Sequence, residues 1–176
     1  MNFCRCHKIA MTCGNCGKVK ITFHPYNLLA LEIPVRQTSG SDQLSITLEE
    51  CFTETFQAKE GAWSCDHCLK LAMKKLDIWT TPDILIIQLK RPHLYRTGQG
   101  SMPIDYPVEG LDLMGKVGLS EDKELVYDLF ATINYTYDNP RKGIYTAFAK
   151  NFIDKQWYRY DGMCYHLSYA ICADDS

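Results

Sequence analysis

Apolar and polar positions along the chain predict a series of strands. In residues 18–23, Val19, Ile21 and Phe23 alternate with polar side chains, which is the period of a half-buried strand. His24 and Pro25 are expected to end that strand. Further strands are expected where β-branched and aromatic residues are bounded by Pro, Gly, Asn or Asp, at residues 28–35, 73–79, 84–89, 126–135, 143–150 and 156–160.

A single helix is predicted to begin at Thr47. Thr47 and Glu50 fit a capping box, in which each side chain bonds to the backbone N–H of the other residue. Four apolar side chains then fall on one helical face: Leu48, Cys51, Phe52 and Phe56. Cys51 is therefore expected to be a small buried apolar residue. One helix among many strands indicates an α+β fold dominated by antiparallel sheet.

The composition is that of a folded domain without a nucleic-acid footprint. Hydrophobic residues form 46% of the 176 residues, and 19 Lys plus Arg against 21 Asp plus Glu give a net charge of -2. A protein that follows a phosphate backbone usually carries excess positive charge, so nucleic acid is not expected as a partner. No apolar run approaches the roughly 18 residues of a membrane-spanning helix, so no membrane partner is expected.

The nine cysteines favour an intracellular protein. An odd number of cysteines cannot pair completely in disulfides, and the opening residues lack the uninterrupted apolar segment of a secretory signal. A reduced compartment, cytoplasmic or nuclear, is therefore expected.

Two Cys-x-x-Cys pairs predict a structural zinc site. Cys13 and Cys16 form the first pair, and Cys65 and Cys68 form the second. Two such knuckles complete a closed tetrahedral site with no position left for a catalytic water. Neither pair has the βαβ surroundings of a thioredoxin motif, so redox chemistry is disfavoured. The alternative is four structural thiols without a metal.

The remaining cysteines and most histidines are expected in less specific places. Cys4 and Cys6 are expected to be exposed thiols of a loose N-terminus. Cys164 and Cys172 lie in apolar surroundings and are expected in the core. Four histidines are expected at the surface or in loops: His7, His24, His67 and His93.

Six segments follow one another from Trp63 onward: WSCDHC, KKLDIWTTPDILIIQLKR, YPVEGLDL, YDLFATINYTYDN, GIYTAFAKN and QWYRYDG. Their order and residues resemble the C-terminal part of the ubiquitin-specific protease catalytic domain. Upstream, TCGNCGKVKITFHPYNLLALEIPV and LEECFTETF are similar to the first zinc knuckle and strand of that family's fingers and to its finger-to-palm helix. The resemblance implies a papain-like palm of mostly antiparallel sheet with zinc-ribbon fingers.

The same resemblance implies a division of the chain. Residues 1–10 would be an N-terminal extension and residues 11–176 a truncated catalytic domain, with fingers at about 11–80 and palm at about 81–176. The family's thumb subdomain is expected to be missing, and the last palm strand to be short or absent. Pro92 stands where the family has an aromatic residue, so the strand before it is expected to end early.

The family's catalytic residues are not expected to be intact. Cysteine-protease chemistry needs a thiolate, an imidazole base and a polar group that orients the imidazole. The family's nucleophile box, Asn-x-Gly-Asn-Thr-Cys, has no counterpart, and its Gly-His-Tyr-Thr-Ala segment has Ile144 at the histidine position. Asp161 stands at the orienting Asp/Asn position, Gly162 replaces the second Asp, and His166 is not expected to substitute for the base. Loss of a nucleophile-base unit costs on the order of 10⁶-fold in rate.

The resulting hypothesis is a ubiquitin carboxyl-terminal hydrolase-like protein that is catalytically inactive and binds ubiquitin or ubiquitinated proteins through residues not yet assigned. One alternative is a fragment or isoform of an active cysteine-type deubiquitinase, or a chain completed by a thumb supplied in trans. A zinc-ribbon scaffold or nucleic-acid module is disfavoured by the acidic charge balance. The fourth alternative is a chain too incomplete to fold stably.

Overall fold

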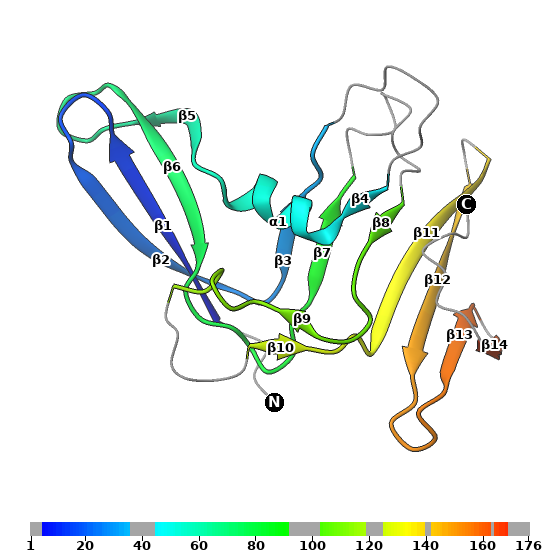
Figure 1. Ribbon diagram of the computed structural model, residues 1–176. Coiled ribbons are helices and arrows are strands. Elements are labelled where there is room, and N and C mark those ends of the chain that lie inside the picture. Colours follow the sequence, from blue (N-terminus) through cyan, green and yellow to red (C-terminus); the bar gives the residue numbers. More distant parts are fainter. Residues whose placement is uncertain are drawn as a thin grey trace.

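Fourteen strands and one helix make up the part of the chain that the structure describes (Figure 1). The computed structural model describes residues 5–35, 45–91, 103–118, 125–139, 142–162 and 164–168. The elements in chain order are β1 (Arg5–Cys13), β2 (Val19–Tyr26), β3 (Leu29–Glu32), β4 (Ile46–Thr47), α1 (Leu48–Phe56), β5 (Lys59–Ser64), β6 (Leu71–Ile78), β7 (Ile87–Lys90), β8 (Ile104–Asp105), β9 (Leu111–Asp112), β10 (Val126–Tyr127), β11 (Ala131–Asn139), β12 (Lys142–Lys150), β13 (Trp157–Asp161) and β14 (Cys164–Ser168). The expected α+β class with mostly antiparallel sheet is confirmed, and two short pairs, β3–β7 and β4–β8, are parallel.

Strands from the first half of the chain form a four-stranded antiparallel sheet in the order β2-β1-β6-β5, called here the N-terminal sheet. Its register pairs Thr12 with Val19 between β1 and β2, and Cys13 with Ala72 between β1 and β6. The turn after β1 and the turn before β6 therefore lie at the same end of the sheet, the far left tip in Figure 1.

Strand β2 continues through His24 and Pro25 to Tyr26, so the expectation that these residues end the strand is wrong. β2 is the edge of the N-terminal sheet, and Cys6 of β1 lies opposite Pro25. An edge strand has one side outside the hydrogen-bond ladder, and that side accommodates a residue without a backbone N–H.

The start of the described chain belongs to the N-terminal sheet. Cys6 and His7 lie in β1 and are half-buried, and the Cys6 N–H donates to Thr80 Oγ1 at 3.1 Å. The Trp79 N–H donates to the Cys6 carbonyl at 3.0 Å. The expectations of an exposed Cys6 and of a surface or loop His7 are therefore wrong, because β1 is an inner strand paired on both sides. Cys4 lies outside the described residues.

Helix α1 begins with the capping box that the sequence predicts. The Glu50 N–H donates to Thr47 Oγ1 at 3.2 Å, and the Thr47 N–H donates to Glu50 Oε2 at 2.8 Å. Leu48, Cys51 and Phe52 are buried on the face turned toward the core, which confirms the apolar stripe. The helix, nine residues long, is far too short to span a bilayer, and the described residues contain no other helix that could do so.

The main core lies between α1, the parallel pair β3–β7 and the inner ends of β2 and β6. Leu29 and Leu31 of β3, Phe52 of α1 and Ile78 of β6 are fully buried there. Leu29 is paired with Ile87 of β7, which packs against the same cluster. This core holds the inner end of the N-terminal sheet in place.

A second four-stranded antiparallel sheet, called here the C-terminal sheet, follows the chain order β11-β12-β13-β14. Its strands are joined as successive hairpins, and β14 is five residues long. β7 begins at Ile87, later than the expected residue 84, and ends at Lys90, close to the expected residue 89. Cys172, and the side chain of Cys164, lie outside the described part of the chain.

Candidate functional site

Two turns of matching geometry close the tip of the N-terminal sheet. In the first, the Cys13 N–H donates to the Lys18 carbonyl at 2.9 Å, and the Gly17 N–H donates to the Cys13 carbonyl at 3.0 Å. In the second, the Cys65 N–H donates to the Lys70 carbonyl at 2.8 Å, and the Leu69 N–H donates to the Cys65 carbonyl at 2.9 Å. Gly17 and Leu69 both adopt positive φ values, 69° and 58°. Leu69 accepts a left-handed conformation that favours glycine, which indicates that the turn shape is enforced.

The two turns bring the four predicted cysteines together. Their sulfur atoms all lie within 4.8 Å of one another, with Cys13 Sγ 3.4 Å from Cys68 Sγ and Cys16 Sγ 3.6 Å from Cys65 Sγ. Four thiolates at about 2.3 Å from a tetrahedral zinc ion are about 3.8 Å apart, so the cluster needs little adjustment to hold the metal. The cysteines are close enough to bind a metal ion.

The protonation of these thiols is set by the knuckles themselves. Backbone N–H groups lower the pKa of the first thiol of each knuckle, Cys13 and Cys65. A hydrogen bond from the Lys18 backbone lowers the pKa of Cys16, but desolvation and the neighbouring thiols outweigh it and raise this pKa to about 11. Four adjacent thiolates repel one another, and a divalent cation offsets that repulsion.

Two residues at predicted catalytic positions lie on neighbouring strands of the C-terminal sheet. They are Ile144, predicted to replace the family's histidine, and Asp161, predicted to keep its orienting carboxylate. Ile144 is on β12, opposite Thr136 of β11, and is 47% exposed. Asp161 ends β13, and its Oδ2 lies 3.8 Å from Arg159 Nε. An isoleucine side chain neither accepts nor donates a proton, and the carboxylate here faces a guanidinium. The correspondence of both residues with the family's catalytic positions remains a prediction.

A model of the ubiquitin carboxyl-terminal hydrolase family matches residues 5–167. The chain belongs to this family. Human ubiquitin carboxyl-terminal hydrolase 43 is 36% identical, in a match covering 72% of this chain and 14% of the relative. Ubiquitin carboxyl-terminal hydrolase 12 of Saccharomyces cerevisiae is 35% identical, covering 74% of this chain and 11% of the relative. This member of the family thus spans a small part of the length of the curated relatives it matches.

Solved structures of the SAGA DUB module that contains Ubp8 share the fold. The SAGA DUB module of Ubp8, Sgf11, Sus1 and Sgf73 bound to monoubiquitin matches with a TM-score of 0.72 and 22% identity. The match covers 94% of this chain and 37% of that one. The same module bound to ubiquitin aldehyde matches with a TM-score of 0.70. The fold is therefore that of a ubiquitin-specific protease.

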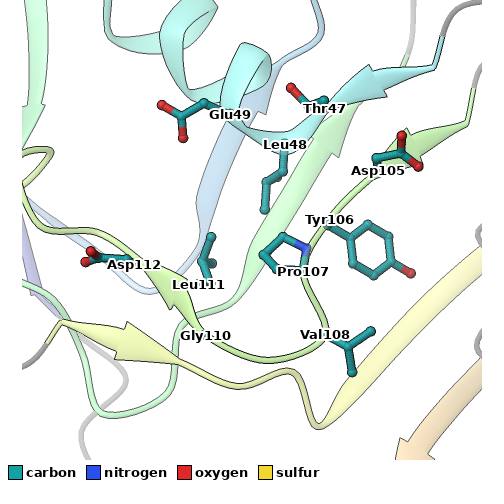
Figure 2. Close-up of a pocket in the computed structure, with 10 residues that line it drawn as sticks. All are labelled: Thr47, Leu48, Glu49, Asp105, Tyr106, Pro107, Val108, Gly110, Leu111 and Asp112. Atoms are coloured by element: carbon teal, nitrogen blue, oxygen red, sulfur yellow. The ribbon is translucent and has the colours of Figure 1, made fainter.

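A pocket that the sequence did not predict lies between the start of α1 and the segment that joins β8 to β9 (Figure 2). Its volume is about 600 Å³. The segment YPVEGLDL lines much of it, and in the sequence this segment is marked only by its resemblance to the family. The sequence places three acidic residues among apolar ones between Asp105 and Asp112, but the parallel β4–β8 pairing that brings this segment to α1 is long-range.

Proposed function

We propose that this chain forms the fingers and palm of a ubiquitin-specific protease catalytic domain and binds ubiquitin or ubiquitinated proteins without hydrolysing them. The observation that carries the proposal is the shared fold with Ubp8 in a structure bound to monoubiquitin. The fingers would cover about residues 11–80, extended to Arg5 by the start of β1, and the palm about residues 81–176. The proposal includes an intracellular location and neither nucleic acid nor a membrane as partner.

The proposed cofactor is one structural zinc ion, held by Cys13, Cys16, Cys65 and Cys68. The sulfur spacing supports this choice, because it is close to that of a tetrahedral four-thiolate site. Four protein ligands leave no open position, so the metal would stabilise the fold and take no part in hydrolysis. Its effect would be to lock the two knuckles of the N-terminal sheet to each other.

The proposed lack of activity rests on Ile144. A general base contributes about 10²- to 10⁴-fold to a hydrolysis rate, and an aliphatic side chain at that position supplies none of it. Asp161 would still stand where the family orients its imidazole, but in this chain its carboxylate lies 3.8 Å from Arg159 Nε. An aspartate without an imidazole to orient has no catalytic role of its own.

The proposal is tested by titrating the purified 176-residue chain with ubiquitin and following binding by calorimetry or by NMR of labelled ubiquitin. We expect saturable binding below about 1 mM, weaker after Cys65→Ser and unchanged after Cys6→Ser, because Cys65 belongs to the sulfur cluster and Cys6 does not. Absence of binding up to that concentration by a chain that unfolds cooperatively would contradict the proposal.

The alternative, a fragment of an active deubiquitinase, is favoured by the family match and by the acidic residue at position 161. It is separated from the first proposal by hydrolysis of a fluorogenic ubiquitin-amide reporter. We expect the unmodified chain and Ile144→His to match the uncatalysed rate. Reporter cleavage by the unmodified chain that disappears after Asp161→Ala would establish the alternative.

A further inference from the structure

The C-terminal sheet has large apolar and aromatic side chains on its solvent-facing side. On one face of the sheet, Thr146 and Phe148 of β12 are buried, so this face is turned toward the rest of the protein. An antiparallel sheet that is packed on one face usually presents polar side chains on the other. The other face of this sheet instead carries four large side chains that are 38% to 74% exposed: Ile133, Tyr135, Tyr145 and Tyr160.

The strand register joins these four side chains into one continuous surface, called here the tyrosine face. Ile133 of β11 is paired with Ala147 of β12, which is paired in turn with Tyr160 of β13. Tyr135 is paired with Tyr145, and the centroids of their rings lie 4.5 Å apart. Residues that pair directly, or that lie two apart along a strand, share a face of the sheet. Ala147 therefore lies among the four, and it projects less far from the sheet than its neighbours do.

The described residues of the tyrosine face carry no formal charge. The register adds Ala131, Ala149 and Tyr158 to this face. Arg159 and Asp161 lie on β13 as well, but alternation places them on the opposite face. A partner that brought charged side chains onto the tyrosine face would desolvate them without supplying a countercharge. Two copies of the face, by contrast, can meet without any contact between like charges.

The size of the tyrosine face predicts a weak association. A fully exposed side chain of this size offers about 200 Å², so the four large side chains together present about 450 Å². A patch of this size is comparable with the largest apolar patch of a typical monomer, which often has a function. Two such patches would bury about 900 Å², less than the roughly 1,200 Å² at which stable interfaces begin. An association through this face alone is thus expected to be reversible.

We propose that the tyrosine face is the interface of a weak, two-fold symmetric dimer of this chain. A two-fold dimer uses the same surface of both copies, so an uncharged face meets an uncharged face. Sheet faces pack about 10 Å apart with their side chains interdigitated, and a large side chain of the second copy fits above Ala147. The C-terminal sheet stands at the right-hand side of the molecule in Figure 1, with β11, β12 and β13 side by side.

This association needs neither zinc nor ubiquitin. Failure of ubiquitin binding would leave the dimer standing, and absence of the dimer would leave the proposed function standing.

The test is sedimentation velocity of the full chain, without ubiquitin, from about 5 µM to about 500 µM. We expect the average mass to rise from monomer toward dimer with a Kd between about 10 µM and about 500 µM, and to return on dilution. Because the interface carries no charge, raising salt from about 50 mM to about 500 mM should not weaken the dimer. A monomer throughout the range, growth beyond the dimer, or several-fold weakening by salt would overturn the proposal.

The variant that locates the interface is Tyr145→Lys, with Phe152→Lys as its matched control. Two-fold symmetry brings two lysines into the interface without a countercharge, so Tyr145→Lys should weaken the dimer at least about tenfold. Phe152 is 80% exposed but lies in the turn between β12 and β13, so its variant should dimerise normally. Unchanged dimerisation of Tyr145→Lys, or equal weakening in the two variants, would overturn the proposal.

Tyr145 also separates face packing from pairing of strand edges. β12 is an inner strand, so copies that joined through the edge of a sheet would not be affected by Tyr145→Lys. Ile133→Lys, at a position that is 74% exposed, is the second variant and should weaken the dimer in the same way. If neither variant folds, the concentration and salt dependence of the unmodified chain decide the matter.

Discussion

At the scale of single residues, His7 is the titratable group whose surroundings differ most from the sequence-based expectation. Its ring stacks on Tyr26, with centroids 4.0 Å apart and an interplanar angle of 15°. Its Nε2 atom is buried and makes no hydrogen bond within the described part of the chain. Burial, and then the nearby charge of His24, lower the pKa of His7. Histidine is common at surfaces, and nothing in the local sequence marks this one as half-buried.

The lowered pKa of His7 predicts a loss of stability in mild acid. Above its unfolded pKa of about 6.5, His7 is neutral in both states, and the fold bears no penalty. As the pH falls through that value, the unfolded state binds the proton more readily than the folded state, so the free energy of unfolding decreases. We expect His7→Phe, which keeps an aromatic ring beside Tyr26, to show a smaller decrease in urea midpoint between about pH 7.5 and about pH 5.

Comparison at about pH 7.5 is the internal control, since both proteins are neutral at this position there. An equal decrease in the two proteins would show that His7 does not contribute to the acid sensitivity.

At the scale of elements, the start of α1 is determined by a few neighbouring residues, the capping box of Thr47 and Glu50. Replacing Thr47 with alanine removes the acceptor for the Glu50 N–H and should lower the free energy of unfolding by about 1 kcal/mol. Thr53→Ala is the matched control, because its hydroxyl donates to the Glu49 carbonyl in mid-helix and caps nothing. Chemical denaturation of both variants measures the difference, and an equal effect of the two would count against the cap.

Elements set by nearby residues were predictable, and elements set by distant ones were not. The capping box depends on residues three apart, and the strand at residues 18–23 depends on alternation within six positions. The strand forms as part of β2, but the expectation that one face of it is buried is wrong, because Val19, Ile21 and Phe23 are each at least 50% exposed. The extension of β2 through Pro25 depends on its place at the edge of a sheet. The parallel pairing of Leu29 with Ile87 joins parts of the chain that no local pattern connects.

At the scale of the whole molecule, the four-cysteine cluster and the main core are at opposite ends of the N-terminal sheet (Figure 1). The two Cys-x-x-Cys pairs were recognisable from their spacing alone. Cys13 contacts Cys68, and Cys16 contacts Cys65, because of the register of β1 on β6. The spacing of the cysteines in the sequence does not determine this register.

Removal of the proposed zinc is therefore expected to loosen one end of the molecule first. After treatment with a strong zinc chelator, amide hydrogen exchange should accelerate at residues 13–18 and 65–70, where knuckle hydrogen bonds close the turns. Exchange at Leu29 and Leu31, fully buried in the main core, should stay slow. Cys16→Ser should reproduce the pattern without chelator, and Cys51→Ala should not. Unchanged exchange in the two turns would contradict a metal-dependent tip.

Strand β6 is anchored to the core at Ile78, while its other end lies at the tip of the N-terminal sheet. Ile78 is fully buried in the core, and its carbonyl accepts a hydrogen bond from the Gly118 N–H at 2.7 Å. Eight residues of strand at about 3.3 Å each span about 25 Å, so a tilt of β6 by about 5° at Ile78 moves its other end by about 2 Å. The rigidity of the contacts at Ile78 therefore affects the position of the four-cysteine cluster.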